Sequence, residues 1–361
     1  QSLLRAMLAS EVARTLRMLL LVFSAIAAGT ILAETGLRLI GADRGGVFTV
    51  NTHEFSRIPG IFAPGHDGLE RTTPELTHRV RIDSLGYRGT DFPRPKADGE
   101  FRVVFLGDSF VFGSYVEDSE TLPAQLSVAL NSRCTGPVRV INAGLGGSTI
   151  RDQFRMMERA IVLNPDLVIL QFSENDVTDL AGPSMWEDLE RSRSTKSSFP
   201  FSLGYPLLRS TALWNLALKA RSVLRSRQSA RALDQSSMDA LPVGGATDLN
   251  NYRSRYEQQL ERFRDALSVR ELPFVYAVFP SHLSVYELRE SDQLEWLDGV
   301  IQALDLRSVS FLRALADDGR PQEELYLLPD DGHASAQGYG IAARVLPGYL
   351  VHHGGRRTLR H

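Results

Sequence analysis

The stretch VVFLGDSFVFG, residues 103–113, decides how the rest of the sequence is interpreted. Its first four residues, Val103 to Leu106, are all apolar, which predicts a buried β-strand. Gly107-Asp108-Ser109 then interrupts the apolar run before Phe110-Val111-Phe112 resumes it. A single triplet of this composition is by default a turn. The alternative is that Ser109 is a nucleophile presented at the end of a core strand.

From about residue 100 onward, short apolar runs alternate with segments that have a helical pattern. The apolar runs cover 101–106, 138–142, 166–172, 273–279 and part of 308–312. The helical segments cover 119–132, 150–163, 251–270, 291–304 and 335–350. Such alternation is typical of a parallel sheet covered by helices on both faces. We therefore predict an α/β fold with a doubly wound parallel five-stranded sheet of flavodoxin-like order.

Polar segments follow three of the expected strands. Gly107-Asp108-Ser109 follows the first, NAGLGGST (142–149) the second and SEND (173–176) the third. A fourth polar segment, PDDGHASAQGYG (329–340), precedes the last helix. Because ligands bind at the carboxyl ends of the strands in sheets of this kind, these segments are expected to meet on one rim.

The residue types on this rim match the requirements of acyl transfer. A serine nucleophile needs a base within hydrogen-bond reach, and the base needs an orienting acid. Ser109 is the candidate nucleophile, His333 the base and Asp330 the acid, because a D-x-x-H spacing lets the carboxylate hold Nδ1–H while Nε2 faces the serine. Asp331 is the alternative acid, which this spacing disfavours. The oxyanion of the intermediate also needs donors already in place.

The four blocks together resemble the SGNH (GDSL-like) hydrolases over residues 101–350. The resemblance implies a flavodoxin-like fold and ester hydrolysis or acyl transfer. It also implies roles by position: Ser109, Asp330 and His333 are catalytic, and the oxyanion donors are Ser109, Gly147 (with Gly146 as the near alternative) and Asn175. One departure is that Ser173 stands where the third block of the family usually has glycine. The N-terminal apolar segment and the LGYRG sequence (85–89) are similar to a bacterial membrane-anchored subgroup.

Other chemistries are disfavoured by the sequence. No P-loop and no G-x-S-x-G elbow is present. Thr149 stands where a dinucleotide fingerprint would place its third glycine, and His333 has no second histidine or cysteine at metal-ligand spacing. We therefore expect no cofactor and no metal. The formal net charge of -3 does not favour nucleic acid as a partner.

The N-terminal region predicts a membrane anchor. Met18 to Ala33 carries no charge, and this length lies near the lower limit of a membrane span, about 17–25 residues. Basic residues precede it, which by the positive-inside rule keeps the N-terminus cytoplasmic and places the rest of the chain on the extracytoplasmic (periplasmic) side. A cleaved signal peptide is the competing interpretation, since Ala25-Ile26-Ala27 resembles a cleavage site. A buried core helix is the third interpretation. The basic residues that precede the apolar segment are Arg5, Arg14 and Arg17.

The chain accordingly divides into four parts. Residues 1–43 form the tail and anchor, 44–100 an irregular cover segment (with a strand and a turn at 78–89), 101–350 the hydrolase domain and 351–361 a flexible tail. An insertion at about 181–249 is the candidate substrate-determining lid. From Arg191 to Leu233 it contains nine Lys or Arg and no acid. Residues 207–227 predict a basic amphipathic helix that contacts an anionic surface or substrate, with Lys219, Arg221 and Arg225 on its charged face.

These observations predict a membrane-anchored serine acyl hydrolase. Its expected partners are the membrane and an acyl-ester substrate, with an acylated glycan or lipid as candidates. An O-acyltransferase that uses the same residues on an extracellular glycan is the alternative within the enzyme class. A catalytically silent cell-envelope scaffold is the alternative of another class.

Overall fold

The structure is a computed structural model of the whole chain, and it divides into two compact units. One unit comprises Gln1–Val47 and Lys196–Gln235, and the other comprises Phe48–Thr195 and Ser236–His361. The two units are described separately below. The structure describes residues 2–40, 62, 64–71, 76–182, 184–200, 202–204, 211–214, 216–217, 246–287, 292–329 and 331–353.

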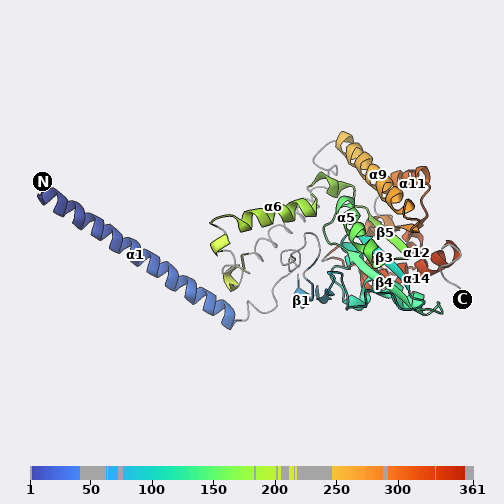
Figure 1. The fold of residues 1–361 in the computed structure, drawn as a ribbon, viewed down its shortest axis with the longest axis horizontal. Helices are drawn as coiled ribbons and strands as arrows, with labels where there is room; N and C mark the ends of the chain where they lie inside the picture. The colour runs from blue at the N-terminus through green and yellow to red at the C-terminus, as the bar shows by residue number, and fades with distance from the viewer. Residues whose placement is uncertain are drawn as a thin grey trace. The chain divides into compact units, whose positions relative to one another are not determined.

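The larger unit is built on a five-stranded parallel sheet (Figure 1). Its strand order is β4-β3-β5-β6-β7, so β3, the first strand of this sheet along the chain, lies between β4 and β5. This is the flavodoxin-like order, and it confirms the predicted fold class. The strands are β3 (Phe101–Gly107), β4 (Val138–Gly144), β5 (Leu167–Ser173), β6 (Phe274–Phe279) and β7 (Ser308–Ser310).

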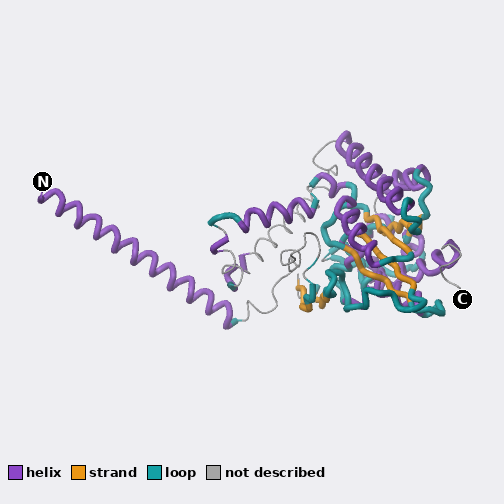
Figure 2. The backbone as a smooth tube through the Cα atoms, viewed as in Figure 1, coloured by secondary structure: helices purple, strands orange, loops and turns teal. Residues whose placement is uncertain are grey.

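Helices cover both faces of this sheet (Figure 2). On one face lie α5 (Ile150–Ala160), α9 (Ala246–Ser268) and α11 (Asp292–Ala303), and on the other α4 (Leu122–Asn131), α12 (Leu312–Ala316) and α14 (Ala336–His353). The remaining helices of this unit are short or peripheral: α3 (Ser109–Phe112), α6 (Met185–Ser197, which crosses the boundary between the units), α10 (His282–Val285), α13 (Gln322–Leu325) and the 3₁₀ turns at Asp118–Glu120, Ile161–Leu163 and Thr178–Ala181.

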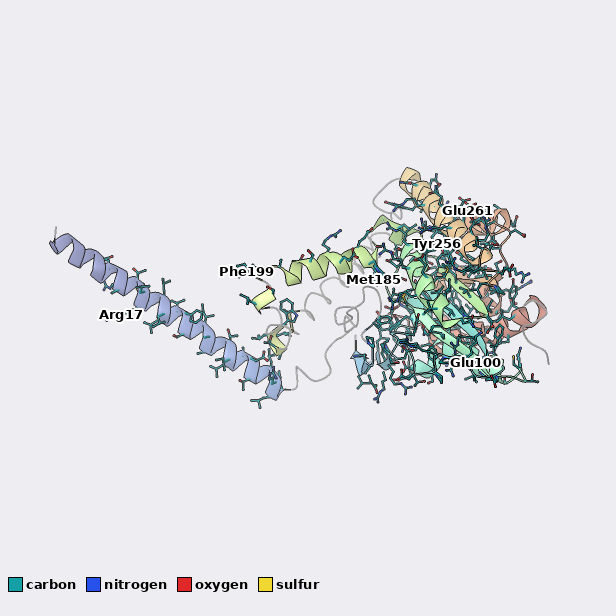
Figure 3. All side chains as sticks on the ribbon, viewed as in Figure 1. Arg17, Glu100, Met185, Phe199, Tyr256 and Glu261 are labelled. Carbon is teal, nitrogen blue, oxygen red and sulfur yellow. The ribbon has the colours of Figure 1, made fainter. Side chains whose placement is uncertain are left out.

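The two apolar cores follow from the alternation of side chains along the strands. Val104 and Leu106 of β3 point to the face of α5 and α9, whereas Val103 and Phe105 point to the face of α4 and α14. All four are fully buried, which is why the sequence has a continuous apolar run here. Tyr256, labelled on α9 in Figure 3, is fully buried in the first core and satisfies its hydroxyl on Tyr276 of β6 at 2.9 Å.

The segment before the sheet is partly regular. It contains an antiparallel pair, β1 (Asp67–Arg71) and β2 (Thr77–Arg81), so the strand predicted within 78–89 is present. A turn follows, in which Asp83 accepts the backbone N–H of Leu85 (2.8 Å) and of Tyr87 (2.9 Å). Arg88 then forms a bridge with Asn142 on the free edge of β4. The segment therefore covers an edge of the sheet that would otherwise be exposed.

The smaller unit is dominated by the helix α1 (Ser2–Leu39). Its residues Ala13–Leu39 are long and apolar enough to cross a membrane, and none of that window is buried in the protein. Arg17, labelled in Figure 3, lies near the start of this window. At the other end, Glu34 accepts the backbone N–H groups of Ala212 (2.9 Å) and Leu213 (3.1 Å), which belong to the long insertion.

Two predictions concern residues that the structure describes only in part. Within the predicted amphipathic helix 207–227, only 211–214 and 216–217 belong to the described residues, and Lys219, Arg221 and Arg225 lie outside them. Helix α14 continues to His353 and so includes the first three residues of the predicted flexible tail, 351–361. The apolar and helix-compatible sequence LVHH explains this continuation, and 354–361 lie outside the described residues.

Candidate active site

The candidate active site lies at the carboxyl ends of the first three sheet strands. Strand β3 ends at Gly107, and α3 begins two residues later at Ser109. Asp108 caps this helix by accepting the backbone N–H of Phe110 at 2.9 Å. Helix α3 lies directly against the end of β4, where a Cβ on Gly144 would come within 2.1 Å of the backbone nitrogen of Phe112. The glycine at 144 therefore allows the turn that presents Ser109.

Ser109 lies within hydrogen-bond distance of a histidine that follows it by more than two hundred residues. His333 Nε2 is 2.7 Å from Ser109 Oγ, and His333 Nδ1 contacts a carboxylate oxygen of Asp331. A carboxylate can only accept, so Nδ1 carries the proton. In the neutral imidazole Nε2 is therefore the acceptor, and the Ser109 hydroxyl donates to it. This is the protonation pattern that a general base requires.

The carboxylate at Nδ1 belongs to Asp331 and not to Asp330, which the D-x-x-H spacing favoured. Asp331 Oδ1 also accepts the backbone N–H of His333 at 2.9 Å, which closes a tight turn over two residues. The turn is held at its base by Leu327, whose carbonyl accepts from Asp331 N (2.8 Å) and whose N–H donates to His333 O (2.9 Å). Asp330 lies outside the described residues.

Two aromatic rings confine the imidazole of His333. The ring of Phe110 lies 4.8 Å from it, centroid to centroid, and the ring of Tyr115 meets it edge-on at 5.3 Å. Burial acts to raise the pKa of the Asp331 carboxyl, but hydrogen bonds and charge from His333, together with a hydrogen bond from Tyr115, bring this pKa below its usual value. Asp331 is thus held as the carboxylate that the Nδ1 proton needs.

The three expected oxyanion donors differ in how available they are. Among the described residues, the backbone N–H groups of Ser109, Gly146 and Gly147 donate to no protein acceptor, and Gly147 lies in the left-handed region (φ 72°) that suits glycine. The amide nitrogen of Asn175 instead donates to Asp179 at 2.8 Å. Its other contact, with Asp108 Oδ2, is long at 3.5 Å, which leaves the second N–H of the amide available for a substrate.

A match to a known family supports an enzymatic interpretation of this geometry. The GDSL-like lipase/acylhydrolase family matches residues 105–341, which is more than half of the chain. The chain belongs to this family. It is accordingly a hydrolase or acyltransferase that acts on ester bonds, with the SGNH fold. Comparison with curated proteins finds no match.

Solved structures with similar folds are distant from this GDSL-like protein. A lipolytic protein of the G-D-S-L family from Desulfitobacterium hafniense is 15% identical, with a TM-score of 0.41 over 69% of this chain and 99% of its own. The acetylxylan esterase Axe2 from Geobacillus stearothermophilus is 16% identical, with a TM-score of 0.41 over 72% of this chain and 97% of its own.

The departure of this GDSL-like protein from the third family block has a structural explanation. Ser173 stands where glycine is usual, and its hydroxyl donates to Asp108 Oδ1 at 3.3 Å. Asp108 is fully buried, which raises the pKa of its carboxyl. Burial and the neighbouring charge of Asp108 raise the pKa of Asp176 well above its usual value. Ser173 thus adds a hydrogen bond to the buried carboxylate that caps α3.

Sequence reasoning did not assign roles to two residues beside the site. The ring of Tyr115 contacts that of His333, and its hydroxyl lowers the pKa of the Asp331 carboxyl. Arg88 binds the backbone on either side of Tyr115. The LGYRG sequence contains Arg88, but its pattern does not say which loop this arginine meets. Within the described part of the chain, no group of three or more His, Cys, Asp or Glu side chains is placed to hold a metal ion.

Proposed function

We propose that the protein is a membrane-anchored serine acyl hydrolase in which Ser109 is the nucleophile, His333 the general base and Asp331 the orienting acid. The observation that carries this proposal is the position of the His333 imidazole, with Nε2 on Ser109 Oγ and Nδ1 on Asp331. Asp331 takes the role that the family resemblance suggested for Asp330.

The reaction follows from these contacts. Ser109 Oγ attacks the carbonyl carbon of the ester while its proton moves to His333 Nε2. The N–H groups of Ser109 and Gly147 and the Asn175 amide stabilise the negative oxygen. The bond to the leaving alcohol then breaks as Nε2 returns the proton to the alcohol oxygen. Water attacks the acyl-enzyme, Nε2 takes its proton and passes it to Ser109 Oγ, and the carboxylic acid leaves.

A panel of acyl esters with product analysis tests the proposal and separates hydrolysis from transfer. The panel spans acetyl to long-chain esters and is run with and without a sugar acceptor. Free acid as the only acyl product supports the hydrolase. An acylated sugar formed at the expense of free acid would instead identify the O-acyltransferase, since an alcohol then replaces water in the second step. No turnover, with no fluorophosphonate label on Ser109, would favour the silent scaffold.

The anchor is supported by the apolar window Ala13–Leu39 of α1. Arg14 and Arg17 lie at the N-terminal end of this window, and by the positive-inside rule they favour a cytoplasmic N-terminus with the ester-acting domain on the extracytoplasmic side. The full chain is expected to stay in the membrane pellet after alkaline carbonate extraction. Protease added to spheroplasts should then degrade the ester-acting domain. Release by carbonate, or protection from protease, would contradict this part of the proposal.

Replacing Asn175 with alanine is expected to lower kcat by roughly 10²–10³-fold with little change in KM. The reason is that the second N–H of the amide is proposed to bind the developing oxyanion rather than the ground-state carbonyl. Steady-state kinetics on the best ester of the panel measure both constants. If KM rises while kcat is unchanged, Asn175 binds substrate and does not stabilise the transition state.

A further inference from the structure

Tyr115 occupies an unusual position between the candidate catalytic pair and the segment that precedes the sheet. Its backbone has φ 69°, in the left-handed region that a bulky side chain rarely adopts. Its ring meets the imidazole of His333 edge-on at 5.3 Å, and its hydroxyl acts as a hydrogen-bond donor that lowers the pKa of the Asp331 carboxyl. On its other side the ring lies 6.0 Å from that of His78 on β2.

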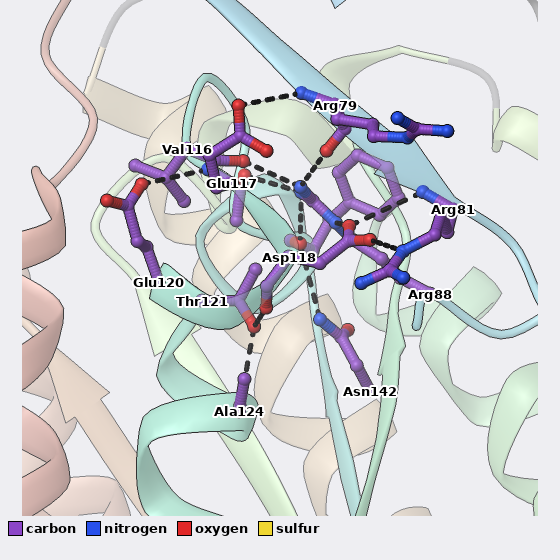
Figure 4. A network of polar contacts seen from close by, with 12 residues as sticks. Arg79, Arg81, Arg88, Val116, Glu117, Asp118, Glu120, Thr121, Ala124 and Asn142 are labelled. Carbon is purple, nitrogen blue, oxygen red and sulfur yellow. Dashed lines mark hydrogen bonds and ion pairs between the residues drawn. The ribbon is translucent and has the colours of Figure 1, made fainter. Parts of the chain in front are cut away.

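The loop that carries Tyr115 is bound by one buried arginine. Arg88 donates to the carbonyls of Gly113 (2.6 Å, from Nη1) and Val116 (2.6 Å, from Nη2), which flank Tyr115. It also donates to the carbonyl of Phe112 at 2.8 Å, and its Nε pairs with Asp118 at 3.0 Å (Figure 4). The Arg88 side chain is only 1% exposed. A guanidinium in this setting fixes several carbonyls at once, which a single ammonium cannot do.

Closing the loop at 113–116 does not by itself require a tyrosine at position 115. A glycine at 115 would adopt the left-handed backbone without steric cost, yet the position holds a large aromatic residue. Residues held in sparsely populated backbone regions cluster at active sites, where the surrounding structure over-determines them. Here the over-determining contacts are the Arg88 hydrogen bonds, and the side chain that they orient touches both Asp331 and His333.

We propose that Tyr115 is a positioning residue that holds the Asp331–His333 pair in register with Ser109, and that Arg88 orients Tyr115 by binding the carbonyls on either side of it. The inference rests on the proposed function, because it assigns a role toward that same pair. Under this inference the segment 76–89 contributes to catalysis, because Arg88 binds the loop that carries Tyr115 from outside the sheet.

Tyr115→Phe keeps the ring and removes only the hydroxyl, so it isolates the hydrogen bond to Asp331. The rate at which a fluorophosphonate labels Ser109 in the full chain is expected to fall about tenfold, as for loss of a hydrogen bond to a charged group. Tyr286→Phe is the matched control, because that hydroxyl donates to the carbonyl of Arg320 (2.8 Å) and not to the pair. Its labelling rate should equal that of the wild type.

The pH profile of labelling separates positioning from general structural support. The groups that face His333 are Asp331, Ser109, Asp108 and Tyr115. The Tyr115 hydroxyl favours the ionised Asp331 carboxylate and so lowers its pKa. Loss of the hydroxyl raises the pKa of the Asp331 carboxyl, so the acid limb of the Tyr115→Phe profile should move to higher pH. A variant that is only partly folded would lose labelling at every pH without moving this limb.

Arg88→Lys tests the second half of the inference. Lysine keeps the charge but cannot bind three carbonyls and Asp118 together. Labelling should slow by about the same factor as in Tyr115→Phe, and the double variant should be little worse than either single one, because both act through one ring. Arg81→Gln is the control: Arg81 also pairs with Asp118 (2.8 Å), but its side chain is 45% exposed and binds none of the carbonyls flanking Tyr115.

The outcomes distinguish this inference from the proposed function. If wild-type Ser109 is not labelled at all, the proposed function fails. If the wild type is labelled, and Tyr115→Phe has the same rate and the same acid limb, the proposed function stands and the positioning role of Tyr115 is wrong. If Tyr115→Phe is slow but Arg88→Lys is fully active, the role of Arg88 is wrong.

Discussion

Ser109→Ala is expected to reduce turnover of the best ester by about four orders of magnitude or more, without altering the fold. The side chain is the proposed nucleophile, and only its hydroxyl, 2.7 Å from His333 Nε2, is removed. His333→Ala should be as severe, because a serine without its base is not ionised at neutral pH. Both losses are measured as initial rates, at an enzyme concentration high enough for turnover to exceed background hydrolysis.

The double variant is the sharper part of this prediction. Residues that act as a unit are far from additive, so Ser109→Ala/His333→Ala should be scarcely slower than either single variant. Ser119→Ala is the matched control, since this exposed serine lies in the same part of the chain and outside the site. A Ser109→Ala protein with a rate near that of the wild type would overturn the mechanism.

The fold could be predicted because its sheet is encoded locally. Strands β3 and β5 are buried on both faces, so they appear in the sequence as nearly continuous apolar runs, interrupted only by Arg102 in β3 and Gln171 in β5. Strand β7, with only Ser308–Ser310, is short and only partly apolar, and its position was correspondingly predicted only in part. The strand order is not encoded in any single run; it was predicted because five strands alternating with helices fit the flavodoxin-like order, which the family resemblance also implies.

The site was predictable only as far as residue types and chain order allow. Ser109 and His333 stand out because each lies within a conspicuous polar segment. The choice between Asp330 and Asp331 depends on how the backbone turns between Leu327 and His333. Spacing alone favoured Asp330, whereas the contact observed at Nδ1 is made by Asp331.

Tyr115 could not be found from the sequence for a different reason. Its relevance comes from a positive φ and from contacts with residues more than two hundred positions later. Neither property leaves a periodic signal. The hydrogen bond from the Asn175 amide to Asp179 could not be predicted either, since the two residues are four apart in a turn that residue propensities do not specify.

The two adjacent aspartates provide the second large effect. Asp331→Asn is expected to lower kcat by about 10⁴-fold, as when the orienting acid of a Ser-His-Asp triad becomes an amide. An amide at this place can donate to His333 Nδ1, and this favours the tautomer that carries its proton on Nε2. A protonated Nε2 cannot accept the proton of the Ser109 hydroxyl. Asp330→Asn, at the neighbouring position, is the control. It should keep kcat within about threefold of the wild type, because the carboxylate observed at His333 Nδ1 is that of Asp331.

The comparison is informative because both variants remove one charge at neighbouring positions. A general electrostatic effect on the site would therefore lower both rates alike, whereas the orienting role acts through the single proton on His333 Nδ1. Only one carboxylate can accept that proton at close range, and Asp331 holds it while also accepting the backbone N–H of His333. If Asp330→Asn is the variant that loses activity and Asp331→Asn does not, the acid is the one that the D-x-x-H spacing favoured, and the turn at 331–333 must rearrange before His333 acts as a base.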